Sequence, residues 1–292
     1  MVRVVTDSTA DIPPEMAEEL GITVVRSYIA FGSETYQDGV DLTKQQFYDK
    51  LIVSRVIPTT AAPPIGAYEE VFSSLAKETD EIVSLQVVGR LSALYSVAAI
   101  AAQSVSQAAG VRIKVVDTGQ ITMGYGWMAV AAAEAARRGE TLDQIVTLVE
   151  GMKPRARVLA ILDTLEFVHR GGRVSWATAV IGTLLRVKPI VQVYLGNAEL
   201  LERTRTIERS FDRLIERVQA MGKLERAIVL HTNAIGLADR LARRVQAIYP
   251  GWEPLIGQAG VTVASHVGPG AVGVACVAAG RSDKKQIVAA GM

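Results

Sequence analysis

Arg173 is the residue whose surroundings in the sequence point most clearly to chemistry. It lies in residues 162–175 (LDTLEFVHRGGRVS), after a short predicted helix that Thr164 can cap and that two glycines end. A guanidinium keeps its charge inside a protein and does not enter apolar surroundings without a partner. Arg173 therefore needs an anion. The sequence leaves two sources equally open, a bound ligand or one of the nearby carboxylates of Asp163 and Glu166.

The three histidines and the single cysteine do not form a metal-binding pattern. His169, His231 and His266 lie far apart, and none has ligand spacing to another histidine or to Cys276. We therefore predict no metal site, and we interpret Cys276, in its apolar run, as an inert core thiol. His266 on its own is interpreted as a structural histidine. A functional role becomes the better interpretation only if the fold brings the polar loops to Arg173.

Common nucleotide and hydrolase signatures give no support for a cofactor or an active site. The sequence contains neither the G-x-x-x-x-G-K-[ST] phosphate loop nor the G-x-S-x-G nucleophile turn. Two matches to G-x-G-x-x-[GA] occur, at residues 124–129 and 268–273. The first begins well past its predicted strand and the second contains a proline, so neither predicts a dinucleotide site.

Four loops rich in hydroxyl residues follow predicted strands, at residues 6–11, 59–62, 89–92 and 117–122. In a parallel sheet the loops at the carboxyl ends of the strands gather along one edge, where ligands bind. Hydroxyl groups at such an edge suit an uncharged or anionic ligand. The alternative is that these side chains only cap the helices that follow them.

Strands and helices alternate over the first half of the chain. Apolar runs at residues 2–5, 22–31, 81–88 and 111–116 are interpreted as strands, with amphipathic helices between them. This alternation predicts a parallel sheet with helices on both faces. We therefore predict a three-layer α/β/α domain over residues 1–153.

Residues 154–292 mix their elements differently and are predicted to form a second α/β domain with a mixed sheet. Residues 188–194 and 199–204 flank a Gly-Asn turn, which indicates an antiparallel hairpin. Two apolar runs near the end, at residues 261–265 and 272–277, are interpreted as further strands. The predicted fold class is thus α/β with two domains.

Composition narrows the class of protein and its location. The 292 residues carry a formal net charge of +1, and no run of Lys or Arg stands out, so a nucleic-acid partner is not expected. Asp7 and Asp11 interrupt the N-terminal segment where a signal peptide would need an apolar core. The long uncharged stretches contain many small and polar residues or a Gly-Pro-Gly break, so stable membrane insertion is not expected. We expect a cytoplasmic protein.

Three segments together resemble the DegV family of bacterial fatty-acid-binding proteins. They are residues 6–13 (TDSTADIP), 162–175 and 266–275 (HVGPGAVGVA), and the resemblance extends from residue 3 to about residue 280. It implies a two-domain fold that holds a long-chain fatty acid between the domains. It further implies a carrier that is not an enzyme, needs no cofactor, and presents the acid to a separate ATP-dependent fatty acid kinase protein. By motif, the resemblance places the carboxylate-binding residues at Thr60, Ser92, Arg173 and His266.

The sequence departs from the family pattern in two of the loops that would line the pocket. The family usually has Thr-Ser-Gln-Pro where this chain has Thr60-Ala61-Ala62-Pro63, and Ser-Gly-Thr where it has Ser92-Ala93-Leu94. Ala61, Ala93 and Leu94 are expected to line the pocket near the head group. Two alternatives stay open. One is a stand-alone enzyme acting on a small phosphorylated or acyl substrate, with Arg173 as anion clamp and His266 as acid or base; the other is an interaction protein without a ligand.

Overall fold

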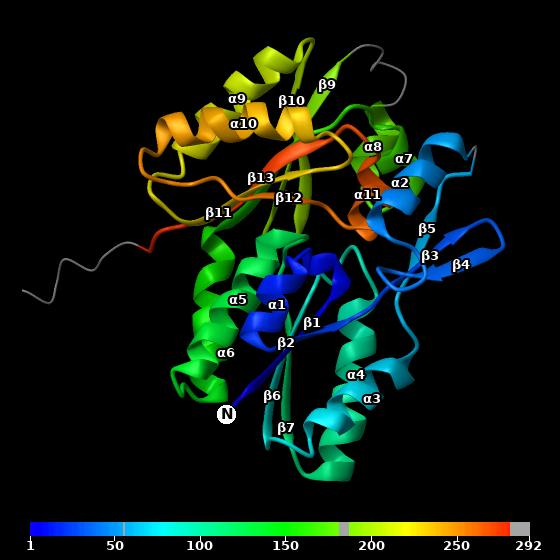
Figure 1. Cartoon of the computed structure of the whole chain (residues 1–292), viewed down its shortest axis with the longest axis vertical. Helices are drawn as coiled ribbons and strands as arrows, with labels where there is room; N and C mark the ends of the chain where they lie inside the picture. The colour runs from blue at the N-terminus through cyan, green and yellow to red at the C-terminus, as the bar shows by residue number, and fades with distance from the viewer. Residues whose placement is uncertain (55, 181–186, 281–292) are drawn as a thin grey trace, which may run out of the picture.

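The computed structural model describes all residues except 55, 181–186 and 281–292 (Figure 1). Its first sheet has four parallel strands in the order β2-β1-β6-β7. Helices α5 and α6 pack on one face, and α4, with α3 against it, packs on the other (Figure 1). This is the predicted three-layer arrangement. Its elements are β1 (Arg3–Asp7), η1 (Ser8–Ala10), α1 (Pro14–Leu20), β2 (Ile22–Val25), α3 (Ile65–Leu75), β6 (Glu81–Gln86), α4 (Leu94–Ala109), β7 (Arg112–Asp117), α5 (Met123–Arg137) and α6 (Leu142–Met152).

The second sheet has six strands in the order β10-β9-β8-β13-β11-β12. Only the β11–β12 pair is parallel, so the sheet is mixed, as the sequence predicts. Helices α9 and α10 cover its outer face and build a core with Phe211 and Leu214 (Figure 1). Its elements are η2 (Lys153–Arg155), β8 (Ala156–Ile161), β9 (Lys188–Tyr194), β10 (Asn197–Thr204), α9 (Ile207–Gln219), β11 (Leu224–His231), α10 (Ile235–Ile248), β12 (Ile256–Gln258) and β13 (Val272–Ala278).

A third, small sheet lies beside the other two, and a helix from near the end of the described chain packs against it. Strands β3 (Tyr28–Phe31), β4 (Glu34–Gln37) and β5 (Thr59–Ala61) are antiparallel, and α2 (Lys44–Val53) packs near them. Helix α11 (Val261–Val267) contributes Val261 and Ala264 to the same core. Two short helices, α7 (Glu166–Gly171) and α8 (Ser175–Val180), lie close by, with α7 in contact with α11.

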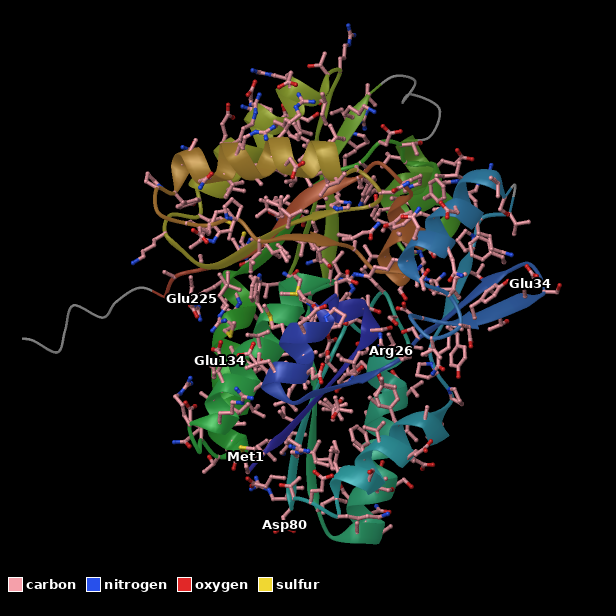
Figure 2. All side chains as sticks on the ribbon, viewed as in Figure 1. Met1, Arg26, Glu34, Asp80, Glu134 and Glu225 are labelled. Carbon is pink, nitrogen blue, oxygen red and sulfur yellow. The ribbon has the colours of Figure 1, made fainter. Side chains whose placement is uncertain are left out.

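Helix α5 connects the first two sheets because it packs against both. Nearly all of its residues are buried, which is why its sequence is apolar on every side. The indole of Trp127 donates a hydrogen bond to the carbonyl oxygen of Ala275 in β13 at 3.2 Å. At its far end Glu134 pairs with Arg226 of β11, beside Glu225 (Figure 2). No helix among the described residues is both long enough and apolar enough to cross a bilayer.

Two predicted strands are wrong. Residues 22–31 form two strands, β2 and β3, in different sheets, because Ser27 between them is buried and its N–H donates to Ser8 Oγ at 3.1 Å. Residues 261–265 form helix α11. Val261 and Ala264 are three positions apart, so a helix places both on the core face that α2 and β3 offer. The hairpin prediction is confirmed by β9 and β10. The boundary between domains at residues 153 and 154 falls within η2 and stays a prediction.

Candidate functional site

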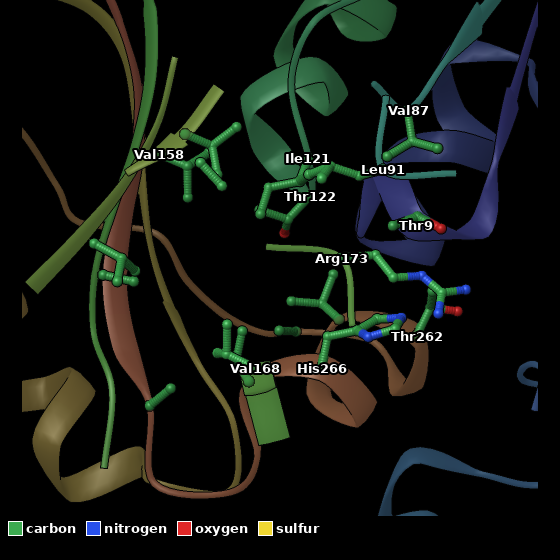
Figure 3. Close-up of a pocket in the computed structure, with 18 of the residues that line it drawn as sticks. Thr9, Val87, Leu91, Ile121, Thr122, Val158, Val168, Arg173, Thr262 and His266 are labelled. Atoms are coloured by element: carbon green, nitrogen blue, oxygen red, sulfur yellow. The ribbon is translucent and has the colours of Figure 1, made fainter. Parts of the chain in front are cut away.

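A cavity of about 410 Å³ opens between the loops of the four-stranded sheet, the six-stranded sheet and α11 (Figure 3). All seven residues that the sequence analysis placed in the pocket line it: Thr60, Ala61, Ser92, Ala93, Leu94, Arg173 and His266. These residues come from four separate stretches of the chain. The cavity is within the size range of sites that enclose small molecules.

Most of the cavity wall is apolar, and several polar side chains gather on one side of it. Figure 3 shows Arg173, His266, Thr9 and Thr262 on one side and Val158 on the opposite side. Along β8, Val158 and Ala160 line the cavity, whereas Leu159 and Ile161 belong to the core beneath α9. This alternation follows from the two-residue period of a strand. Further apolar lining comes from β9, β13 and the segment around α7 and α8: Leu162, Val168, Val174, Trp176, Val191, Val193 and Val274.

Arg173 is positioned by the turn that ends α7. Thr164 was predicted to cap this helix; the N-cap is instead Leu165, which makes no side-chain cap, although Thr164 Oγ1 accepts the N–H of Glu166, the first helical residue, at 3.1 Å. Gly172 then ends the helix with a φ of +65°, a conformation that side chains rarely adopt. Arg173 follows with an exposed side chain whose Nη1 donates to the carbonyl oxygen of Gly171 at 2.9 Å.

The two carboxylates that could neutralise Arg173 within the chain have other partners. Asp163 pairs with Lys188, and Glu166 pairs with Arg170 at 2.8 Å. Across the part of the chain that the structure describes, Arg173 has no ion pair. The interpretation of Arg173 as an internal salt-bridge residue is therefore wrong for these two partners, and its charge faces the cavity.

His266 lies on α11 with both ring nitrogens near the polar end of the cavity. Its Nε2 is 2.9 Å from Thr60 Oγ1, while Nδ1 is buried and has no hydrogen-bond partner. Burial, with a smaller contribution from the charge of Arg173, lowers the pKa of His266 to about 4. The imidazole is therefore neutral at pH 7, and one ring nitrogen can donate while the other accepts.

Ser92 and its two neighbours line the cavity from the start of α4. The N–H of Leu94, the first residue of α4, donates to Ser92 Oγ at 3.3 Å, and Ser92 lines the cavity. The N-cap of the helix is Ala93, which makes no side-chain cap, so the capping interpretation does not account for Ser92. Leu94 is only 2% exposed and belongs to the main core, whereas Ala61 is exposed at the cavity wall.

Sequence reasoning missed a second set of polar residues in the same cavity. Thr9, Ser27 and Thr262 line it, and the hydroxyl oxygen of each is buried without a hydrogen-bond partner. Thr9 lies in a loop that the sequence marked as polar. Ser27 lies at the break in a run that was interpreted as one strand, and Thr262 lies in a run that was wrongly interpreted as a strand, so no local pattern pointed to them.

The remaining titratable groups do not form a metal centre. Among the described residues no group of three or more His, Cys, Asp or Glu side chains could hold a metal ion. Cys276 is fully buried, and burial raises the pKa of its thiol to about 12, so it stays protonated. His231 also lines the cavity, but its Nδ1 accepts the N–H of Ala234 at 3.2 Å and burial lowers its pKa.

Comparison with known proteins gives one consistent family. A sequence model of a protein family, described as "Uncharacterised protein, DegV family", matches residues 1–279. A DegV domain-containing protein of Deinococcus radiodurans is 34% identical over 278 residues, covering 94% of this chain and 97% of the relative. One from Streptomyces coelicolor is 35% identical over 277 residues, with the same coverage.

Two solved structures share both the fold and a significant part of the sequence. DegV of Bacillus subtilis, described as a fatty acid binding protein, is 32% identical with a TM-score of 0.85. The matched region covers 94% of this chain and 99% of the Bacillus subtilis chain. A DegV family protein of Thermus thermophilus, described by its fatty acid binding, is 29% identical with a TM-score of 0.87. It covers 95% of this chain and 99% of its own.

Proposed function

The chain belongs to the DegV family, and from this premise we propose that it binds one long-chain fatty acid in the cavity described above. The observation that carries the proposal is that Arg173, His266 and several hydroxyl side chains gather on one side of a cavity whose wall is otherwise mostly apolar. The relatives of Bacillus subtilis and Thermus thermophilus are described as fatty acid binding. In this proposal the acid lies between the predicted domains at residues 1–153 and 154–292.

The tail sets the affinity, and the polar end sets the orientation. Burying one methylene contributes roughly 0.8 kcal/mol, so about 15 methylenes contribute on the order of 12 kcal/mol before ordering costs. A hydrogen bond to a charged group contributes only about 1.5–3 kcal/mol. The polar groups are still required, because a carboxylate buried without partners would become protonated.

Four residues form the carboxylate site in this proposal. Arg173 supplies the positive charge and Ser92 a hydroxyl donor, and the hydrogen-bonded pair of Thr60 and the neutral His266 supplies one more donor, either the Thr60 O–H or the ring N–H, because the other proton lies in their shared bond. Because Arg173 is exposed, the carboxylate end lies nearer to solvent than the tail. A separate ATP-dependent kinase protein could therefore reach the carboxylate without removal of the acid. We place this encounter between the bound acid and the kinase protein in the cytoplasm, where ATP is available.

Mass spectrometry of an organic extract of the purified protein tests the proposal. We expect a long-chain fatty acid near one per chain when the protein is produced in bacteria. Protein that is empty and also fails to take up added palmitate or oleate would contradict it. Turnover of a small acyl or phosphorylated substrate without any partner protein would instead support the stand-alone enzyme.

A further inference from the structure

Three buried hydroxyl groups in the cavity wall have no partner within the protein. Thr9, Ser27 and Thr262 are 5%, 1% and 8% exposed. The hydroxyls of Ser27 and Thr262 make no hydrogen bond, and that of Thr9 makes none of good geometry, although it lies close enough to Asp7 to favour the charged form of that carboxyl group; all three residues line the cavity. A buried polar group without a partner costs about 1–3 kcal/mol, so native proteins rarely leave one unsatisfied. Three such groups at one wall point to a ligand group that completes them.

Contacts between their elements place these hydroxyls together. Helix α11, which carries Thr262, packs against η1, which carries Thr9, and against β3, which Ser27 precedes. The N–H of Ser27 donates to Ser8 Oγ at 3.1 Å, and the N–H of Gly260 donates to Asp11 Oδ1 at 2.7 Å. These two bonds hold the residues before β3 and the start of α11 against the loop that contains Thr9.

These three hydroxyls lie close to the proposed carboxylate site along the cavity wall. Thr262 precedes His266 by four residues, just over one turn of α11, or about 6 Å along its axis. Strand β3 pairs with β5 in antiparallel register, with Ile29 opposite Thr60 and Tyr28 opposite Ala61. Ser27 therefore lies two residues before Ile29, the partner of Thr60. Two strand residues span about 6.6 Å. Both elements thus place the second set of hydroxyls a few carbon positions from a bound carboxylate.

The carboxyl groups beside these three hydroxyls favour a neutral ligand group. Asp7 and Asp11 flank Thr9 in the chain, and Asp7 Oδ1 accepts the N–H of Thr9 at 2.9 Å. Asp7 is fully buried and Asp11 is partly buried, and burial raises the pKa of both carboxyl groups. Burial thus favours the neutral form of both acids, and in these surroundings a neutral ligand hydroxyl can donate to one oxygen and accept from another without the cost of burying a further charge.

We propose that the hydroxyls of Thr9, Ser27 and Thr262 bind a hydroxyl near the carboxyl end of the fatty acid, so that the preferred ligands are 3-hydroxy fatty acids. This inference rests on the proposed function. An unsubstituted acid would leave the three groups to a trapped water, and a ligand hydroxyl that reproduces its hydrogen bonds would replace it.

Titration of delipidated protein with palmitate and with 3-hydroxypalmitate tests the proposal. We expect 3-hydroxypalmitate to bind about three- to tenfold more tightly, as one or more neutral hydrogen bonds would give. Thr262→Val, Ser27→Ala and Thr9→Val should each reduce this preference, measured as the ratio of the two dissociation constants. Because each change removes an unpaired hydroxyl, ligand-free stability should not fall, and each variant should fold.

Ser265→Ala is the matched control on the same helix. Ser265 is buried on α11, does not line the cavity, and donates to the carbonyl oxygen of Val261 at 2.7 Å. The preference for 3-hydroxypalmitate should survive this change. Equal affinity for the two acids in the unmodified protein would overturn the inference and leave the proposed function intact. Failure to bind either acid would overturn the proposed function itself.

Discussion

His266 Nε2 lies 2.9 Å from Thr60 Oγ1, and this contact joins residues 206 positions apart. Thr60 belongs to the small sheet built by the first part of the chain, and His266 belongs to a helix near its end. Neither residue can be placed correctly unless α11 packs against β5. The contact therefore assembles the polar end of the cavity only after both halves of the chain have folded together.

Arg173→Ala should weaken fatty-acid retention, whereas Arg170→Ala should not. Arg170 is paired with Glu166 on the surface, and Arg173 faces the cavity without an ion pair among the described residues. We expect a loss of about 1.5–3 kcal/mol for Arg173→Ala, the size of one charged hydrogen bond. Titration of both variants with palmitate after delipidation measures it. Equal losses would mean that Arg173 has no special relation to the ligand.

A single methyl group behind His266 should also disturb the site. A Cβ at Gly171 would lie 2.8 Å from His266 Nδ1, although the backbone of Gly171 suits an L-residue. Gly171→Ala should therefore shift the ring away from Thr60 and weaken palmitate binding about three- to tenfold. Gly236→Ala, in open space on α10, is the control and should leave binding unchanged. Unchanged binding in Gly171→Ala would show that the ring position is unimportant.

The sequence predicted those site residues whose roles depend on their neighbours in the chain. Two glycines as a helix stop and Arg173 as a charge without an adjacent partner can both be recognised from neighbours in the chain. Ser27 and Thr262 could not be recognised in this way. Residues 22–31 and 261–265 are apolar runs whose conformation is decided by packing between distant segments, so the local pattern missed the break at Ser27 in the first run and gave a strand instead of a helix in the second.

Asp11→Asn should change how stability depends on pH. Asp11 accepts hydrogen bonds from Gly260 N and Thr122 Oγ1, and burial raises its pKa from 3.8 to about 7. The folded state thus keeps a proton that the unfolded state releases, so this group's stabilising contribution, full below pH 4, is lost as the pH rises through about 7. Relative to the wild type, the variant should gain on the order of a few kcal/mol between pH 5 and pH 8.

Urea unfolding of both proteins at several pH values measures this difference, in which the contributions of other groups cancel. Asp49→Asn, which removes an exposed carboxyl group, is the control and should show little trend. A difference between Asp11→Asn and the wild type that stays constant from pH 5 to pH 8 would refute the prediction.

Tryptophan fluorescence should report occupation of the cavity through one residue. The chain has three tryptophans, and only Trp176 lines the cavity, with its indole N–H donating to the carbonyl oxygen of Ala198 at 2.8 Å. Palmitate should change the emission because it replaces water beside this ring. The change should disappear in Trp176→Phe and persist in Trp252→Phe, whose ring packs at the core beneath α9 and α10. Persistence in Trp176→Phe would place the ligand elsewhere.

The departures from the family pattern can be tested at Ala61 without disturbing the core. Leu94 is 2% exposed, so Leu94→Thr would remove core packing and confuse a loss of stability with a change at the site. Ala61 is exposed at the cavity wall, and Ala61→Ser adds only the hydroxyl that the family pattern has there. Palmitate affinity should stay within about twofold, because the tail supplies most of the binding free energy.

The same change should raise the rate of acyl-phosphate formation with ATP and a bacterial fatty acid kinase about three- to tenfold. Phosphoryl transfer needs the carboxylate held in one orientation, and a further donor at the polar end restricts its rotation. His266→Ala should lower the rate in both backgrounds, because it removes a donor next to the reacting oxygen. If wild-type protein already supports the full rate and Ala61→Ser adds nothing, then Thr60, Ser92, Arg173 and His266 are sufficient to orient the acid.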